Sequence, residues 1–217
     1  MPSFLRPLPL PWLKRGFDLA FAIILNTLSA PVFLLASAGI FLEKPAPGTV
    51  GGFAFLHRGA GAPGSSFRLR KFNIFKPGVI EGVQQRGQFA HTKDLRQNDR
   101  SLSIAGTMLQ RAYLDELPQL FSILAGDTTV VGPWPRNLEI YKQGLAKGDF
   151  FRGVLKAGQT SMVQSQKDLP GLTMDKQASM DQEELEFQQN HRSWQLFLLD
   201  LSLICRTVVL MAKAKRL

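Results

Sequence analysis

The longest hydrophobic pattern in the chain is an apolar run from Phe17 to Leu42. The polar side chains inside it are few, namely Asp18, Asn26, Thr27, Ser29 and Ser37. A helix of about 26 residues, each rising about 1.5 Å, is longer than the roughly 30 Å hydrocarbon core of a bilayer. Three interpretations are open: a signal peptide, a spanning helix, or a re-entrant helix-break-helix that enters and leaves by one face. The run is longer than the apolar region of most signal peptides.

Two features bear on the course of this helix through a membrane. Pro31 removes a helical hydrogen bond and clashes with the preceding turn, and the hydroxyl of Ser29 is near enough to satisfy freed backbone groups. Basic residues lie on both sides of the run: Lys14, Arg15, Lys44, Arg58, Arg68, Arg70 and Lys71. Both flanks therefore carry the charge of cytoplasmic segments. These features support a re-entrant and a spanning helix about equally.

Shorter patterns follow in the rest of the chain. Alternation from Phe67 to Arg70 predicts a strand, and Leu138 to Leu145 is compatible with a helix. The run from Trp194 to Met211 is apolar but contains Asp200 and Arg206, which disfavours a membrane span. We expect a helix that packs on the core or lies in the bilayer interface. The acidic run at residues 181–186 is interpreted as a solvated helix face.

Composition narrows the class of partner. The chain has 217 residues, a net charge of +9 and a pI of about 10.0, which favours nucleic acid, a membrane surface or phosphorylated substrates. It contains no nucleic-acid recognition motif, so we expect no nucleic-acid partner. Its one cysteine, Cys205, cannot form an internal disulfide and fits a reducing compartment.

The most informative stretch runs from Gly106 to Asn137. Adjacent carboxylates, Asp115 and Glu116, precede a helix-compatible run with Pro118 in its first turn, and Gly126 would end that helix. Asp115 is then a candidate N-cap. Two neighbouring carboxylates also suit Mg²⁺, with phosphate oxygens as its other ligands. On these residues alone, capping is the commoner explanation.

The longer sequence around the two carboxylates favours a catalytic role over capping. The sequence LDELPQL at residues 114–120, then Gly126-Asp127 and Gly132-Pro133, resembles the bacterial sugar-transferase family of monotopic phosphoglycosyl transferases. The resemblance extends from about Lys14 to the end of the chain. It implies an α+β, mainly helical fold with an N-terminal re-entrant membrane helix in residues 1–44. Residues 45–217 would form a small cytoplasmic catalytic domain with interfacial amphipathic helices.

The resemblance also implies an activity and the residues that perform it. Enzymes of this family transfer a sugar phosphate from a nucleoside diphosphate sugar, here expected to be a UDP-sugar, to polyprenyl phosphate. Asp115 would be the nucleophile that carries the phosphosugar, and Glu116 and Asp115 would hold Mg²⁺. The expected substrate-binding residues are Arg58, Lys71, Arg111, Pro133, Trp134 and Arg136. The enzyme would start exopolysaccharide or lipopolysaccharide assembly at the cytoplasmic face of the bacterial inner membrane, in contact with membrane lipid.

Two departures from the family pattern lie close to this chemistry. The family's arginine five residues before the nucleophile is Gln110 here, and its Pro-Arg-Pro reads with Trp134 in the middle. Arg111 and Arg136 are the candidates to replace the two lost guanidinium groups, which would bind phosphate through paired hydrogen bonds. The alternative is a catalytically degenerate relative that serves as a membrane-surface scaffold or lipid-binding protein. The sequence leaves the sugar, the pathway and assembly into a homo-oligomer open.

Overall fold

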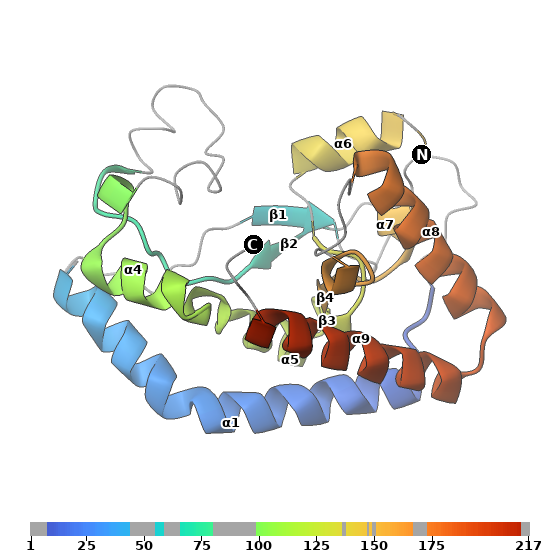
Figure 1. Ribbon diagram of the computed structural model, residues 1–217, viewed down its shortest axis with the longest axis horizontal. Helices are drawn as coiled ribbons and strands as arrows, with labels where there is room; N and C mark the ends of the chain where they lie inside the picture. Colours follow the sequence, from blue (N-terminus) through green and yellow to red (C-terminus); the bar gives the residue numbers. More distant parts are fainter. Residues whose placement is uncertain are drawn as a thin grey trace. The chain divides into compact units, whose positions relative to one another are not determined.

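The computed structural model shows a mainly helical chain with two small sheets, as the sequence predicted (Figure 1). It describes residues 8–43, 55–58, 66–79, 99–135, 138–146, 148, 151–166 and 173–213. Contacts divide the chain into two units. The first comprises Met1–Ile23, Phe55–Arg68 and Ser122–Leu217, and the second Ile24–Ala54 and Leu69–Phe121. The predicted division at residue 44 separates a membrane part from a cytoplasmic part, and it stays a prediction.

Helix α1 spans Trp12–Glu43 without interruption, and Pro31 lies inside it. We expected an unwound segment near Pro31, but the backbone stays helical through the proline. The Ser29 hydroxyl is 3.5 Å from the carbonyl oxygen of Asn26, and that of Ser37 donates to Phe33 over 2.8 Å. The long apolar helix is therefore confirmed as a helix, while its re-entrant course through a membrane stays a prediction.

The second unit is built on the C-terminal half of α1. Its core contains Ala36, Ile40, Phe72, Ile74, Phe75, Leu102 and Leu109. A 3₁₀ turn, η1 (Asp99–Ser101), leads into α4 (Ile104–Arg111), and Ser103 caps α4 by accepting a 2.9 Å hydrogen bond from the amide of Gly106. A Cβ atom at Gly106 would lie 2.0 Å from the carbonyl oxygen of Ile74. Only glycine lets α4 approach the 72–75 segment this closely.

Both sheets of the described residues lie in the first unit, apart from Leu69 at the end of the second strand. Strand β1 (Phe55–Arg58) pairs with β2 (Ser66–Leu69), which confirms the strand predicted near Phe67. Strand β3 (Thr129–Val131) pairs in parallel with β4 (Gly158–Thr160), with Thr129 opposite Gly158. Helix α6 (Leu138–Ala146) confirms the predicted helix and packs near β1. The other elements in the described part of this unit are α7 (Phe151–Val154), η3 (Gln164–Gln166), α8 (Met174–Asn190) and α9 (Ser193–Lys213).

A buried polar network holds the N-terminal end of α1 in the first unit. Lys14 forms an ion pair with Asp200 of α9, and both side chains are almost fully buried. One turn later, Asp18 accepts hydrogen bonds from the Thr129 hydroxyl (2.6 Å) and the Val130 amide (2.9 Å). The aromatic rings of Phe17 and Phe197 meet edge to face, with centroids 5.3 Å apart. The buried carboxylate of Asp200 inside the apolar helix α9 is thus explained by a partner on α1, whereas Arg206 on the same helix is exposed.

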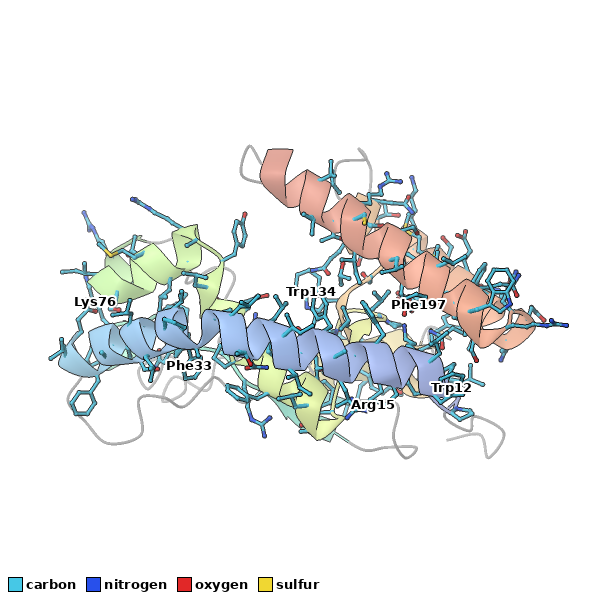
Figure 2. All side chains as sticks on the ribbon, turned by 90° about the horizontal axis from the view of Figure 1, so that it is seen from below. Trp12, Arg15, Phe33, Lys76, Trp134 and Phe197 are labelled. Atoms are coloured by element: carbon cyan, nitrogen blue, oxygen red, sulfur yellow. The ribbon has the colours of Figure 1, made fainter. Side chains whose placement is uncertain are left out.

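Arg15, labelled in Figure 2, contacts a different helix from its neighbour Lys14. Its guanidinium donates to the carbonyl oxygens of Ile123 (2.7 Å) and Leu124 (3.1 Å) at the C-terminal end of α5 (Gln119–Ala125). A cation at a helix C-terminus is favoured because the last carbonyl groups carry partial negative charge. The basic pair that indicated membrane orientation in the sequence therefore also has a structural role.

The acidic run on α8 differs from its interpretation as a solvated face. Asp181 and Glu184 are buried beside Met180 and Leu185, whereas the side chains of Gln182, Glu183 and Glu186 are exposed. Residues three and four apart lie on the same side of a helix, so this short run covers both faces. Among the described residues, α1 and the Ser193–Leu210 part of α9 are long and apolar enough to cross a membrane.

Candidate active site

The Asp-Glu pair lies in a tight turn between two helices of the chain. Helix α4 ends at Arg111, and Tyr113 then adopts a left-handed conformation with φ of 56° and ψ of 22°. A 3₁₀ turn, η2 (Leu114–Glu116), follows directly, and Asp115 in its middle is 1% exposed. Left-handed backbone is costly for residues other than glycine, and such strain often occurs at functional sites. Tyr113 thus redirects the chain immediately before the carboxylates.

The predicted role of Asp115 as an N-cap is wrong. Helix α5 begins at Gln119, four residues later, so Asp115 is too far from its first turn to cap it. The amide of Leu117 bonds to Leu114 over 3.2 Å, which closes a separate 3₁₀ turn around the aspartate. Pro118 precedes the first helical residue rather than lying in the first turn. The predicted stop is confirmed, because Gly126 has a φ of 81° just after α5.

Lys71 contacts this turn directly. Its ammonium forms an ion pair with Glu116 Oε1, and the side chains of Lys71 and Glu116 are 12% and 39% exposed. The neighbouring amide, that of Phe72, donates a 2.9 Å hydrogen bond to the carbonyl oxygen of Asp115. The structure therefore brings Asp115, Glu116 and Lys71 together, three of the residues that the sequence selected.

Two further residues of the second unit flank the turn. Arg111 is the last residue of α4, and its side chain is exposed. Gln110, at the position of the family's arginine, has a buried side-chain oxygen that makes no hydrogen bond within the described part of the chain. An exposed guanidinium can reach a ligand from solvent, whereas the half-buried amide beside it cannot supply a positive charge. Phosphate binding by Arg111 stays a prediction.

The other predicted substrate-binding residues belong to the first unit. Pro133 is buried just beyond β3, and its carbonyl oxygen accepts a 3.0 Å hydrogen bond from Gly158. Trp134 beside it is partly buried and is labelled in Figure 2. Arg136 and the side chain of Arg58 lie outside the described residues. Their roles, and that of Trp134, remain predictions.

Lys156 was not selected from the sequence. It lies just before β4, and both its ammonium and the Arg15 guanidinium would be within 4 Å of a Cβ atom at Gly126. Burial lowers the pKa of Lys156, and the nearby positive charge of Arg15 lowers it further. No local pattern could have revealed this cluster, because Arg15 and Lys156 are far apart in the sequence and meet only through the fold.

Comparison with known proteins gives the family. Residues 10–214 match the model of the family described as bacterial sugar transferase. The chain belongs to that family. The LDELPQL sequence that indicated this family contains the η2 turn, and Asp115 and Glu116 lie in that turn.

Three relatives show what this chain is similar to, and two of them are named as sugar-phosphate transferases that act on undecaprenyl phosphate. A UDP-glucose:undecaprenyl-phosphate glucose-1-phosphate transferase of Caulobacter vibrioides is 36% identical over 126 residues, which are 56% of this chain and 41% of the relative. Exopolysaccharide production protein ExoY of Rhizobium meliloti is 34% identical over 139 residues, 59% of each chain. An Aeromonas hydrophila UDP-N-acetylgalactosamine-undecaprenyl-phosphate N-acetylgalactosaminephosphotransferase is 32% identical over 127 residues, 58% of this chain and 27% of the relative. The matches thus span about a quarter to three fifths of these relatives.

The two neighbouring carboxylates, Asp115 and Glu116, are the candidate ligands for Mg²⁺. Within the described ranges, no group of three or more His, Cys, Asp or Glu side chains could hold a metal ion. Mg²⁺ in phosphate-handling sites is commonly held by one or two carboxylates plus water and substrate phosphates. Asp115 and Glu116, adjacent in one turn, supply that smaller set. The donor chemistry therefore fits Mg²⁺ that arrives with a phosphorylated substrate.

Proposed function

We propose that this protein transfers a sugar phosphate from a nucleoside diphosphate sugar, most simply a UDP-sugar, to undecaprenyl phosphate. The observation that carries the proposal is the η2 turn, where a buried Asp115 adjoins Glu116 and its partner Lys71. Membership of the bacterial sugar transferase family and the activities in the names of the relatives support it. The reaction would begin the assembly of a bacterial surface glycan.

The transfer would take place in two steps, with Asp115 as the nucleophile in the first. In the first, a carboxylate oxygen of Asp115 attacks the phosphorus that bears the sugar, and the bond from that phosphorus to the oxygen of the UMP phosphate breaks. UMP leaves with the bonding electrons, and an acyl phosphate carries the phosphosugar. In the second, an oxygen of undecaprenyl phosphate attacks the same phosphorus and releases the carboxylate. The product is undecaprenyl diphosphate sugar.

The surroundings of Asp115 suit this chemistry. Its near-complete burial limits the contact of the free carboxylate with bulk water before the donor binds. The 2.9 Å hydrogen bond from Phe72 to its carbonyl oxygen fixes the turn that presents the carboxylate. Glu116 and Asp115 would hold Mg²⁺, which neutralises charge on phosphoryl oxygens when it is bound. Lys71 supplies a positive charge on the same side of the turn.

A membrane location follows from the same proposal, because the acceptor is a lipid. Helix α1 has many exposed apolar side chains, among them Leu28, Leu34, Leu35 and Leu42. We propose that α1 enters and leaves the inner membrane by its cytoplasmic face, with the catalytic residues on that face. Trp194 and Leu198 on α9 are also exposed, which suits a helix that lies in the bilayer interface.

The test of this function is release of UMP across donor sugars. The purified full chain in detergent micelles is given Mg²⁺, undecaprenyl phosphate and one UDP-sugar at a time. At least one donor should give UMP and a sugar-bearing undecaprenyl diphosphate in equal amounts. If no UDP-sugar or other nucleoside diphosphate sugar yields either product, the enzyme proposal is wrong and a scaffold role replaces it.

A further inference from the structure

Both the side chain and the backbone of Lys71 are held close to the turn that carries Asp115 and Glu116. Its side chain pairs with Glu116 and is only 12% exposed, so the ammonium has little contact with water and has the carboxylate as its counter-charge. Its backbone is fixed by the adjoining Phe72 amide, which bonds to Asp115, and by a 3.0 Å bond from Ser103 to Ile74. The flexible part of Lys71 is therefore its side chain, which can swing while the main chain stays in place.

A divalent cation at Glu116 would compete with this ion pair. The ammonium and the metal ion are both positive, and each would use the carboxylate of Glu116 as its counter-charge. Separating Lys71 from Glu116 without a new anion would leave a largely buried ammonium uncompensated, which is unfavourable. The diphosphate of the donor is an anion that can replace Glu116, because lysine binds phosphate as a mobile point charge.

We infer that Lys71 is a placeholder, which means that its ammonium occupies the position at Glu116 that a divalent cation takes when it binds. When the cation and the donor bind together, the Lys71 ammonium moves from Glu116 to the donor diphosphate. The inference rests on the proposed function and deepens it, because it couples two ligands of the same site. Before the donor arrives, the pair keeps Glu116 in position and disfavours the metal ion alone. The donor releases Glu116 to the metal by capturing Lys71. Metal and nucleoside diphosphate therefore bind cooperatively, each raising the affinity for the other.

Calorimetric titration of the full chain in detergent micelles measures this coupling without turnover. Mg²⁺ is titrated alone and again with saturating UDP, which carries the diphosphate but no sugar. In the wild type, UDP should lower the Mg²⁺ dissociation constant by about tenfold, a typical size for coupling between two ligands. Lys71→Met should bind Mg²⁺ alone more tightly than the wild type does, and UDP should then raise its affinity by a smaller factor than in the wild type, because only the direct contact between Mg²⁺ and the diphosphate remains.

Two further variants make the comparison specific. Lys76→Met removes the same charge from an exposed position on the same segment, and it should keep the wild-type coupling. Lys71→Arg keeps a cation opposite Glu116 and should retain most of the coupling, so it serves if Lys71→Met does not fold. Wild-type Mg²⁺ affinity and coupling in a folded Lys71→Met protein would overturn the inference.

Failure of this inference differs from failure of the proposed function. If the wild type binds Mg²⁺ equally well with and without UDP, the placeholder role is wrong even when UMP is released from a donor sugar. If no donor yields UMP but the coupling and its loss in Lys71→Met are both observed, the site binds the ligands without performing the transfer. Calorimetry and the UMP assay therefore report on separate claims.

Discussion

Lys14 and Asp200 form a buried ion pair between the first turn of α1 and the middle of α9, with side chains 2% and 5% exposed. The pair ties the start of the apolar N-terminal helix to the last helix within the first unit. Burial raises the pKa of Asp200, and the positive charge of Lys14 opposes that shift. Each charge is therefore tolerated inside the unit because the other is present.

Removing one partner should be far more harmful than removing both. We expect Lys14→Met to destabilise the fold by about 3–5 kcal/mol, because it leaves a buried carboxylate uncompensated. The Lys14→Met/Asp200→Leu double variant should be more stable than Lys14→Met. Thermal unfolding of the two variants and Asp200→Leu in one detergent gives the double-mutant cycle. Additive losses would show that the pair contributes no coupling.

The same pair gives a dependence on pH. In Lys14→Met the pKa of Asp200 should lie above its value in the unfolded chain, because burial disfavours the carboxylate. The folded state then binds more protons, so the deficit of Lys14→Met should shrink as pH falls towards the raised pKa. Unfolding midpoints measured from neutral to mildly acidic pH, relative to the wild type, test this sign. A deficit that grows on acidification would contradict it.

Gly106 provides a test of the packing that supports the catalytic turn. Gly106→Ala places a Cβ atom 2.0 Å from the carbonyl oxygen of Ile74, so α4 must move away from the segment that carries Lys71. We expect the free energy of unfolding to fall by about 3 kcal/mol or more, which is the upper end of the range for overpacking. Gly16→Ala is the matched control, because no atom lies within 4 Å of its Cβ and alanine favours a helix. Equal stability of the two variants would contradict the packing.

Tyr113 provides the opposite kind of test, because its strain can be relieved. Its φ of 56° is costly for tyrosine and free for glycine. Tyr113→Gly should therefore raise the free energy of unfolding by about 1 kcal/mol, whereas Tyr113→Ala should not. Thermal unfolding distinguishes them. If Tyr113→Gly is less stable than Tyr113→Ala, the conformation of this residue is not strained.

The orientation of α1 in the membrane can be tested by labelling. We predict that the N-terminus and the catalytic domain share the cytoplasmic side. Single cysteines near Ser3 and Gln88 are introduced into a Cys205→Ser chain, since Cys205 is exposed. A membrane-impermeant thiol reagent should label neither in intact cells and both in inverted vesicles. Labelling of the two cysteines from opposite sides would show that α1 spans the membrane.

The sequence was most informative where local patterns decide the structure. The apolar run predicted α1, alternation predicted β2, and Gly126 predicted the end of α5, because each depends on neighbouring residues. Asp115 was misjudged as a cap because Pro118 marked the helix start, whereas the chain first forms a separate 3₁₀ turn at Leu114–Glu116. The buried faces of Asp181 and Asp200 were missed for another reason. Asp200 is buried against Lys14, which is distant in the sequence, and Asp181 lies on the side of α8 that packs inward, so neither burial can be read from the spacing of neighbouring residues.

The central claim is that Asp115 is the nucleophile, and the intact mass of the protein tests it most directly. The wild type is incubated with Mg²⁺ and a UDP-sugar that supports turnover, but without undecaprenyl phosphate. We predict release of at most about one UMP per protein and an increase in mass of one phosphosugar. Asp115→Asn, which keeps the shape of the side chain, should gain no mass, and peptide mapping should place the wild-type adduct on Asp115. An Asp115→Asn protein that forms the adduct, or that turns over at the wild-type rate, would contradict the account.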